Sequence, residues 1–366
     1  MRPRLKPALR RIVRDERTLQ FGVHPRHAVV LTDLEPEVRR WVEGLDGVRD
    51  LPGVLAGAAE AGIGEERGLA LLDRLVARGV VDDAGTSPGP LRALTLTERD
   101  RLQPDLDALS LAPGTADGGL SVLERRRGAQ VRVYGAGRVG AQVAALLTAS
   151  GVGNLCVVDP GTARPQDMVP GGLTPAEAGM SRQEGAVAAA RRLAPSATAW
   201  TGREAAHLSD GARRPDLVVL APVRPLDGLL VRDLVDWGIP HLLATAFEGA
   251  GSVGPLVLPG RSACLTCMDL TRRDRDPGWP VVSARLGGFP MGETACGTVL
   301  SAAVAALAAG HALAFLDGEE SAVTNRTVDV LPDWRWKQRS WNVHPKCRCF
   351  RNEFGSPTMV PAATCR

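Results

Sequence analysis

The residues from Ala129 to Asp159 constrain the fold of this chain more than any other stretch. Val131–Tyr134 is a short run of strand-forming residues, and a G-x-G-x-x-G turn follows it directly. The glycines of the turn are Gly135, Gly137 and Gly140. Val139–Thr148 continues as an apolar, alanine-rich helix, and Leu155–Val158 is a second strand that ends at Asp159. The stretch therefore predicts a strand, turn, helix and strand unit.

This unit has the features of a nucleotide-binding Rossmann unit. Glycines allow the backbone to approach a phosphate, and the N-terminus of the following helix supplies free N–H groups and a positive dipole end. An acidic residue at the end of the second strand, here Asp159, can bind the ribose hydroxyls. A second interpretation stays open, in which the glycines only let a helix pack closely on a sheet and no ligand binds.

Composition and charge exclude several classes of protein. The chain has 366 residues, of which 44% are hydrophobic and 23% charged, as in globular proteins of two or three domains. The formal net charge of +3 is too small to indicate a nucleic-acid or membrane surface. The best apolar run, Val299–Phe315, is interrupted by Gly310 and His311, and the basic N-terminus lacks the apolar core of a secretory signal. We therefore expect a cytoplasmic protein with no nucleic-acid or membrane partner and no disulfide framework.

Residues 1–85 are expected to form a separate winged-helix-like module. Two short apolar runs in residues 18–31 surround a His-Pro-Arg turn and predict a hairpin. Glycines separate three predicted helices and a closing strand, which are Glu35–Leu45, Pro52–Ala61, Glu65–Arg78 and Val80–Val81. Residues 86–122 are expected to be a linker with a bridging helix over Thr97–Leu111.

Residues 123–366 are expected to form an α/β domain around the glycine turn. Strands and helices alternate after Asp159, which indicates a doubly wound, mostly parallel sheet. Further strands are predicted at Ala197–Thr201, Asp216–Leu220, Pro240–Thr245 and Val253–Val257, and further helices at Ser181–Leu193 and Val231–Trp237. The expected fold class is therefore a Rossmann-like α/β domain that follows a small N-terminal module.

Four cysteines form two pairs with metal-ligand spacing. Cys264 and Cys267 make a C-x-x-C knuckle, and Cys347 and Cys349 make a C-x-C pair. Two such knuckles supply the four thiolates of a tetrahedral structural zinc site. Closing the long loop between them costs roughly 4–5 kcal/mol, whereas structural zinc contributes about 10–16 kcal/mol, so that zinc binding is expected. A redox-active C-x-x-C is the rival interpretation, but no thioredoxin-like strand and helix surround it.

Other residues near these cysteines leave choices open. His344 could replace one thiolate or shape the turn with Pro345. Cys156 lies in a predicted buried strand, whereas Cys296 opens a helix and is either a dipole-stabilised thiolate or a small packing residue. Three tryptophans alternate with charged residues and could line a partner surface or cover the zinc lobe: Trp334, Trp336 and Trp341.

The N-terminal module resembles the PqqD-like leader-peptide recognition domain of peptide-modifying gene clusters. The resemblance rests on the predicted elements and on VVLTDLEPEVRRWVEGLDGVRDLPGVL, followed later by LLDRLVARGVV. It implies that an extended peptide adds as a strand to the exposed edge of the hairpin through main-chain hydrogen bonds. The implied peptide-binding residues are Gln20, Phe21, Val29, Val30 and Leu31. A DNA-binding winged helix is the alternative, but Glu65–Arg78 carries too few exposed bases to read a groove.

Residues 123–350 resemble the ThiF/MoeB-type ubiquitin-activating superfamily. The resemblance rests on the glycine turn, on SGVGNLCVVDPG and DLVVLAPVRP, on GIPHLLATAFEGAGSVGPLVLPGRSACLTC and on the late cysteine pair. With the PqqD-like module and the ending HPKCRC, the chain resembles the ThiF-like leader-peptide-binding component of thiazole/oxazole-modified microcin clusters. That resemblance implies a precursor-peptide partner, a separate YcaO-type cyclodehydratase that performs the ATP chemistry, and a homodimer.

Active members of the superfamily adenylate a C-terminal carboxylate, and this chain departs from their pattern. They hold ATP, bind magnesium and neutralise charge on the α-phosphate. The ribose-binding Asp159 is kept, but the second acidic residue, two positions on, is replaced by Gly161. The other departures are Asp167 at an Asn position, Pro170 at an Arg position, Arg182 in place of a Lys, and Val223-Arg224 in place of a magnesium-binding Asp-Asn pair.

These departures decide the expected function. A positioned donor or cation on a developing negative charge is worth roughly 2.7–4 kcal/mol, so that two or three such losses should abolish useful adenylation. Arg164 and Arg182 are the candidate catalytic cations that could compensate. We therefore expect a peptide-binding scaffold that could still bind ATP at the glycine turn, with a weakened Mg²⁺ site. The alternative is an ATP-dependent adenylyltransferase that activates a peptide or sulfur-carrier C-terminal carboxylate.

Overall fold

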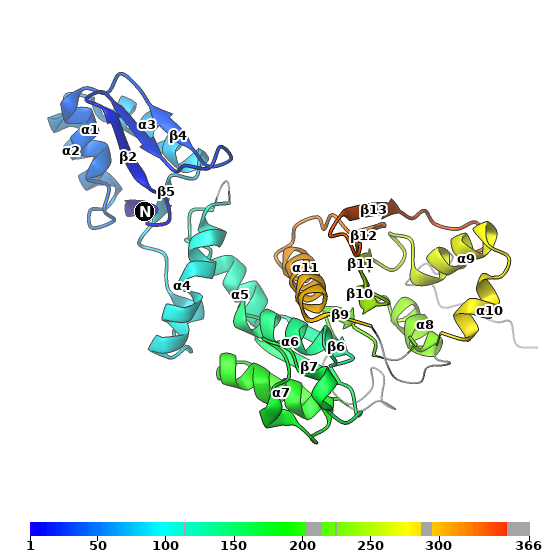
Figure 1. The fold of residues 1–366 in the computed structure, drawn as a ribbon. Coiled ribbons are helices and arrows are strands. Elements are labelled where there is room, and N and C mark those ends of the chain that lie inside the picture. Colours follow the sequence, from blue (N-terminus) through cyan, green and yellow to red (C-terminus); the bar gives the residue numbers. More distant parts are fainter. Residues whose placement is uncertain (113–114, 203–213, 224, 287–294, 350–366) are drawn as a thin grey trace, which may run out of the picture. The chain divides into compact units, whose positions relative to one another are not determined.

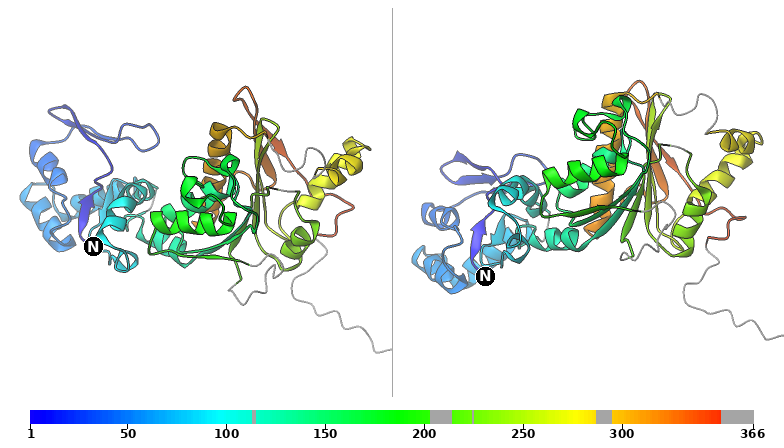
Figure 2. Two further views of the ribbon diagram at one scale, coloured as in Figure 1. Left: turned by 60° about the horizontal axis from the view of Figure 1, so that its bottom comes forward. Right: turned by 90° about the horizontal axis from the view of Figure 1, so that it is seen from below.

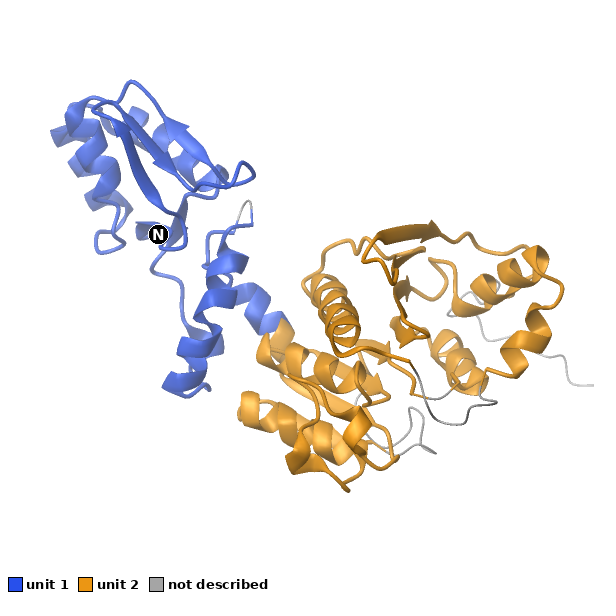
Figure 3. Ribbon diagram, in the orientation of Figure 1, with its two compact units in different colours: residues 1–125 blue, residues 126–366 orange. Residues whose placement is uncertain are grey.

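A computed structural model describes residues 1–112, 115–202, 214–223, 225–286 and 295–349 of the chain. The chain divides into two compact units, Met1–Arg125 and Arg126–Arg366, each with its own hydrophobic core (Figure 3). The division falls a few residues beyond the boundary that the sequence places after residue 122. Residues 86–122, which the sequence assigns to a linker, are part of the first unit.

The first unit combines two small antiparallel sheets with helices (Figure 1). Its strands are β1 (Pro3–Leu5), β2 (Arg11–Asp15), β3 (Thr18–Phe21), β4 (Val29–Leu31) and β5 (Val81–Asp83). Its helices are α1 (Pro36–Glu43), α2 (Leu51–Glu60), α3 (Glu65–Ala77) and α4 (Leu96–Ser110), with a 3-10 turn η1 (Gly89–Leu91), and α5 (Leu120–Gly128) runs on into the second unit. Strands β2, β3 and β4 form one sheet in that order, and β1 pairs with β5.

The predicted hairpin, three helices and closing strand of this unit are confirmed, and two strands were missed. The hairpin is β3 and β4, with Phe21 opposite Val29 in the register. The missed strands are β1 and β2. Strand β2 lies at the edge of its sheet and four of its five residues are exposed. Such a strand shows no apolar alternation, which is why the sequence pattern did not reveal it.

A buried lysine joins the end of α4 to the module. Lys6 is 1% exposed, and its Nζ donates hydrogen bonds to the backbone carbonyls of Ser110 and Thr115. The bond to Ser110 satisfies a carbonyl at the end of α4, where a cation also meets the negative end of the helix dipole. Burial lowers the pKa of Lys6, and the charges of Asp82 and Asp117 offset this only in part. The bridging helix is therefore packed on the module and is not a free linker.

The second unit is built on an eight-stranded sheet with the order β13-β12-β11-β10-β9-β6-β7-β8. Its strands are β6 (Gln130–Tyr134), β7 (Asn154–Val158), β8 (Thr198–Thr201), β9 (Leu217–Leu220), β10 (His241–Phe247), β11 (Ala250–Val257), β12 (Arg326–Val330) and β13 (Trp336–Ser340). Its other elements are α6 (Gly140–Ala149), η2 (Pro165–Asp167), η3 (Pro175–Glu177), α7 (Arg182–Leu193), α8 (Gly228–Asp236), α9 (Leu265–Arg275), α10 (Trp279–Ala284) and α11 (Thr298–Leu316). The neighbours from β8 to β10 are parallel, and those from β10 to β13 are antiparallel. The predicted doubly wound, mostly parallel sheet is confirmed.

Two hydrophobic cores cover the two faces of this sheet. Residues of α6, α7 and α11 form one core with the strands, and residues of α8 and α9 form the other. Figure 2 shows this layering: the green and orange helices lie on one side of the sheet and the yellow-green and yellow helices on the other. The glycine turn belongs to the first face and the cysteine-rich lobe to the second.

Helix α11 corrects one expectation about apolar segments. Gly310 and His311 do not interrupt it, and its 19 residues are long and apolar enough to cross a membrane by length and composition alone. In this unit, however, Val304, Ala308 and Ala312 are completely buried and pack in the core on the sheet. The helix is therefore packed as a core helix. Its uninterrupted apolar length, however, exceeds what the sequence analysis expected.

Candidate functional site

The glycine turn lies where the order of the parallel strands reverses. It follows β6, which has β7 and β8 on one side and β9 and β10 on the other. Ligands of open α/β sheets bind at the carboxyl ends of the strands at such a switch point. The turn, the end of β7 at Asp159 and the start of α7 meet there, so that the predicted nucleotide residues share one site.

Close packing within the protein accounts for the three glycines of the turn. Gly135 has φ +90°, and a Cβ atom on it would lie 2.0 Å from the carbonyl oxygen of Ala221. A Cβ on Gly140 would lie 1.9 Å from the Gly135 oxygen, and one on Gly137 would lie 2.7 Å from Cγ2 of Val223. Gly135 and Gly140 meet backbone atoms, so that glycine is needed at these two positions whether or not a phosphate binds. At position 137 the side chain of Val223 would have to move.

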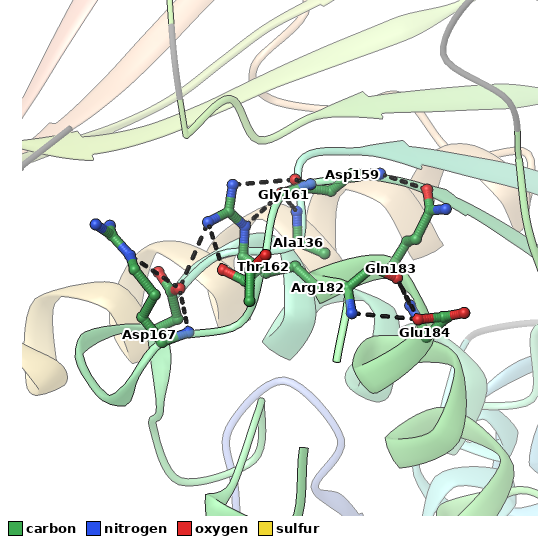
Figure 4. A network of polar contacts seen from close by, with 10 residues as sticks. Ala136, Asp159, Gly161, Thr162, Asp167, Arg182, Gln183 and Glu184 are labelled. Atoms are coloured by element: carbon green, nitrogen blue, oxygen red, sulfur yellow. Dashed lines mark hydrogen bonds and ion pairs between the residues drawn. The ribbon is translucent and has the colours of Figure 1, made fainter. Parts of the chain in front are cut away.

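Protein donors saturate the carboxylate of Asp159 (Figure 4). This residue is 7% exposed. Oδ2 accepts from the Ala136 backbone N–H at 2.8 Å and from Arg182 Nε at 2.9 Å. Oδ1 accepts from Arg182 Nη2 at 3.0 Å and from the Gly161 backbone N–H at 3.1 Å. A carboxylate offers about four acceptor sites, and four donors of the chain already use them.

Arg182 is held on more than one side. It is 6% exposed, follows the N-cap Ser181 of α7, and lies 3.5 Å from Oδ2 of Asp167 as well as beside Asp159. Its Nη1 also donates to the carbonyl of Thr162 at 3.3 Å. Burial lowers the pKa of Arg182, but its bonds to Asp159 and the charges of both aspartates outweigh this and raise the pKa. Arg182 is therefore a fixed cation inside the site.

The second candidate cation, Arg164, is also directed at a carboxylate. Its backbone N–H donates to Oδ2 of Asp167 at 3.0 Å, and its Nε lies 3.9 Å from the same oxygen. Asp167 is buried and forms ion pairs with two arginines, Arg164 and Arg182. Both candidate catalytic arginines thus interact with aspartates of the chain itself.

The end of β9 offers a methyl group where the resemblance implies a magnesium-binding acid. Cγ2 of Val223 lies beside Gly137, where it occupies the space that a Cβ atom on residue 137 would need. Arg224, the other half of that pair, lies outside the described residues. Within the described chain, this corner of the site is therefore apolar.

One residue of the turn was missed by the sequence reasoning. Arg138 follows Gly137, and its guanidinium donates to the carbonyl of Gln166 and to Oγ1 of Thr298, each at 2.7 Å. It ties the glycine turn to the start of α11. Its position inside the glycine motif was the available signal. Nearby Cys296 has a pKa raised by burial, although Arg138 lowers it in part, which fits a packing residue better than a thiolate.

The four predicted metal ligands converge. Their sulfur atoms all lie within 4.8 Å of one another. The Sγ separations are 3.7 Å for Cys264 and Cys267, 3.6 Å for Cys264 and Cys347, and 3.5 Å for Cys267 and Cys349. Four thiolates at about 2.3 Å from one tetrahedral ion are separated by about 3.8 Å. The cluster therefore fits a metal ion such as zinc, with Cys264 just before α9 and Cys267 in its first turn.

Hydrogen bonds prepare one thiol of the cluster for ionisation. The Cys264 thiol and the backbone N–H of His344 both favour a negative charge on Cys267, and its pKa is lowered to about 4. Burial and contacts with neighbouring thiols raise the pKa of Cys349 to about 12. Cysteine binds metal as the thiolate. A bound cation would favour the thiolate form of the other three cysteines as well.

His344 supports the cluster without belonging to it. Its Nε2 lies 2.8 Å from Oδ2 of Asp274, and its Nδ1 accepts from the backbone N–H of Lys346 at 3.2 Å. Both ring nitrogens are therefore used, and His344 shapes the turn and does not replace a thiolate. Cys156 is buried in β7, as predicted.

The three tryptophans divide between the two roles considered. Trp341 is 3% exposed, packs in the core that holds the cysteines and donates from Nε1 to Oγ1 of Thr327. The guanidinium of Arg272 lies 5.6 Å from its ring centroid and 4.9 Å from that of Trp279. Trp334 and Trp336 are more than half exposed and are available to a partner.

The predicted peptide-binding residues lie on β3 and β4. Gln20 pairs with Val30 in the register, and Val30 is 41% exposed. Val29 and Leu31 are half-buried and pack against the core of the module. Phe21, in contrast, is completely buried, so that its side chain serves the core and is not offered to a peptide.

Comparison with known proteins gives a family match and several solved structures with a similar fold. A model of the ThiF family matches residues 111–349. E. coli MccB with succinimide superposes with a TM-score of 0.70 at 15% identity, covering 96% of this chain and all of MccB. E. coli MccB with ATP gives 0.67 at 14% identity over 96% of this chain and all of MccB. PaaA gives 0.70 at 16% identity over 92% of this chain and all of PaaA. At these identities the likeness is one of fold.

Proposed function

This chain belongs to the ThiF family, and from that premise we propose that it is a peptide-binding scaffold without useful adenylation activity of its own. Its first unit binds the leader segment of a precursor peptide, and the protein presents that peptide to a separate modifying enzyme of the YcaO type. The second unit provides the surface for a second copy of the chain or for the partner enzyme.

The observation that carries this proposal is the occupied carboxylate of Asp159. An adenylating enzyme must hold the ribose of ATP, and Asp159 already accepts two bonds from Arg182 and two from backbone N–H groups. It must also stabilise charge at the α-phosphate, where each positioned donor is worth roughly 2.7–4 kcal/mol. Arg164 and Arg182 are directed at Asp167 and Asp159 instead.

The edge strand β4 supports the peptide-binding half of the proposal. It is the last strand of its sheet, and its three residues are apolar. An added strand would extend the sheet and cover the partly exposed side chains of Val29 and Leu31. MccB, which shares the fold, has been crystallised with N-formylated MccA, which supports a precursor peptide as the ligand class.

We propose that the four-cysteine cluster holds a structural zinc ion. All four positions of a tetrahedral site are filled by thiols, which leaves no open position for a substrate. The ion joins α9 to the segment that follows β13, so that it stabilises the lobe and takes no part in a reaction.

An ATP-dependent adenylyltransferase is the second candidate, and one observation favours it. The glycine turn and Asp159 occupy the switch point of the sheet, and MccB, with the same fold, has been crystallised with ATP. In this reading the nucleotide contacts Gly135, Gly137, Gly140 and Asp159, with Arg164 or Arg182 on the phosphates. The reading requires that Arg182 leave Asp159.

Peptide binding by the full chain tests the proposal. Fluorescently labelled leader segments of candidate precursor peptides are titrated with the protein, and anisotropy is recorded. Val30→Asp on the β4 edge should weaken binding about tenfold or more, because a charge there opposes strand addition. Val13→Asp on β2, which is 53% exposed at the opposite edge, is the matched control and should bind as the wild type does. Equal losses in both variants, or no binding by any candidate peptide, would refute the proposed site.

A further inference from the structure

We propose that Gly161 and Arg182 form one latch, which keeps the ribose-binding carboxylate of Asp159 from accepting a nucleotide. The proposal rests on the proposed function, because it states how the glycine-turn site is closed. It also assigns two of the departures from the family pattern, at positions 161 and 182, to a single coupled change. The ligand class that the latch excludes is a nucleoside with vicinal ribose hydroxyls.

The first observation is the geometry of the ion pair. Arg182 places Nε and Nη2 on the two oxygens of Asp159, at 2.9 Å and 3.0 Å. Such a fork of two N–H groups is the arrangement that matches a carboxylate best. Ribose hydroxyls would need the same oxygens as acceptors, so that a nucleotide and this pair exclude each other.

The second observation is the space at residue 161. A Cβ atom on Gly161 would lie 2.3 Å from Nη2 of Arg182, 2.9 Å from Cζ and 3.1 Å from Oδ1 of Asp159. Any side chain at this position would therefore displace the guanidinium. Arg182 needs glycine at 161, and an acidic residue at 161 would need a shorter or differently placed cation at 182.

The third observation is the way in which the latch is anchored. The backbone N–H of Arg182 donates to the Gly161 carbonyl at 2.6 Å, and the backbone N–H of Gln183 donates to the Asp159 carbonyl at 3.0 Å. Gln183 Oε1 accepts in return from the Asp159 backbone N–H at 3.0 Å. These bonds fix the start of α7 against the end of β7 (Figure 4). Asp167 then holds the guanidinium from its other side.

Lysine at 182 would not maintain this arrangement. Its ammonium is a compact charge without the planar fork, so that it cannot satisfy both oxygens of Asp159 together. Arg182→Lys should therefore leave acceptor capacity on Asp159. Adding Gly161→Asp should complete the change, because the added carboxylate draws the ammonium away from Asp159.

The experiment is a calorimetric titration of the full chain with AMP. AMP needs no magnesium, so that the result depends on the ribose anchor and not on the apolar corner at Val223. The variants are Arg182→Lys and the Gly161→Asp/Arg182→Lys double variant. Arg192→Lys is the matched control, because Arg192 lies on the same helix and pairs with the buried Glu177 at 2.7 Å.

The latch predicts that AMP affinity rises about tenfold or more in the double variant, and by a smaller factor in Arg182→Lys. Wild type and Arg192→Lys should bind equally weakly. With 2′,3′-dideoxy-AMP the gain should vanish, because the hydroxyls that contact Asp159 are missing. Arg182→Lys alone decides the question if the double variant does not fold.

Two results would overturn the latch. One is wild-type affinity for AMP equal to that of Arg182→Lys, and the other is a gain that persists with 2′,3′-dideoxy-AMP. Peptide titration of the same variants separates this failure from failure of the proposed function. If the wild type binds no peptide, the proposed scaffold function is refuted, whereas the AMP comparison still tests the latch.

Discussion

The cysteine cluster and the glycine-turn site are both assembled from segments far apart in the chain, yet they differ in what fills them. At the cysteines, four sulfur atoms lie within 4.8 Å of one another, and the histidine beside them is turned toward Asp274. At the glycine turn, Arg182 is placed on the carboxylate that a ligand would use. The first region leaves room for a metal ion such as zinc between its sulfur atoms, whereas Arg182 occupies the carboxylate of the second region.

This difference separates the residues of a motif from the acceptors that it leaves free, because all four hydrogen bonds to the Asp159 carboxylate come from the protein itself. Gly135, Gly140 and Asp159 are all present and correctly placed. Their presence is accounted for by packing and by an internal ion pair. Thus the acceptors and donors left over in a site, rather than its list of residues, decide what it can bind.

The largest expected effect is removal of the metal from the cysteine cluster. Cys267→Ala should abolish stoichiometric metal binding and strongly lower the melting temperature, because structural zinc contributes on the order of 10–16 kcal/mol. Metal content by mass spectrometry and thermal unfolding measure this. Cys296→Ala lies outside the cluster and should retain the metal. If the metal-free wild type has the same melting temperature as the metal-loaded protein, the cysteine cluster does not depend on a metal and does not differ from the glycine-turn site in this respect.

Loss of the buried ion pair should come next. Arg182→Ala leaves the Asp159 charge buried without its main partner, which costs about 3–5 kcal/mol of unfolding free energy. Arg192→Ala should cost less, because the Arg192 side chain is 54% exposed and Glu177 keeps its hydrogen bonds from the backbone N–H and the hydroxyl of Thr174. Urea unfolding of both variants gives the comparison. Equal stabilities would mean that Arg182 does not hold Asp159, and the glycine-turn site would be open.

Acid should weaken the face of the sheet that carries the cysteine cluster. His241 pairs with Val218 and Val257 of that core, and burial lowers its pKa from 6.5 to about 4. The unfolded chain binds a proton below pH 6.5 and the folded chain does not. About 3 kcal/mol of stability, fully present above pH 6.5, should therefore be lost as the pH falls to 4.

The His241→Leu variant checks this assignment. Its unfolding free energy should fall less steeply between pH 6.5 and 4 than that of the wild type, as followed by urea unfolding at several pH values. Metal content measured on the same samples separates the histidine from proton competition at the thiols. An unchanged slope would assign the acid sensitivity to the cysteines instead.

The smallest expected effect concerns the support of the cysteine cluster. Asp274→Asn weakens the bond to Nε2 of His344, whose backbone N–H favours the Cys267 thiolate. Metal affinity, measured by competition with a chelator, should drop by less than about tenfold, since Asp274 is exposed. A loss as large as that in Cys267→Ala would make His344 a ligand.

The sequence predicted the features that depend on local spacing or on residue type. The glycine turn, its flanking strands and the four cysteines fall in this class. Contacts between distant side chains could not be predicted from the sequence. The pairing of Arg182 with Asp159, for example, depends on where α7 starts relative to β7. Strand β13 was missed because all five of its residues are exposed at a sheet edge. Lys6 was missed because a buried lysine has no pattern in sequence.

The most direct test of the central claim is ATP–pyrophosphate exchange by the metal-loaded full chain, with and without a bound leader peptide. An active ThiF-type enzyme is the positive reference. The closed glycine-turn site predicts exchange at background under both conditions, although the peptide binds. Exchange above background would show that ATP displaces Arg182 from Asp159, and the chain would then be an adenylyltransferase.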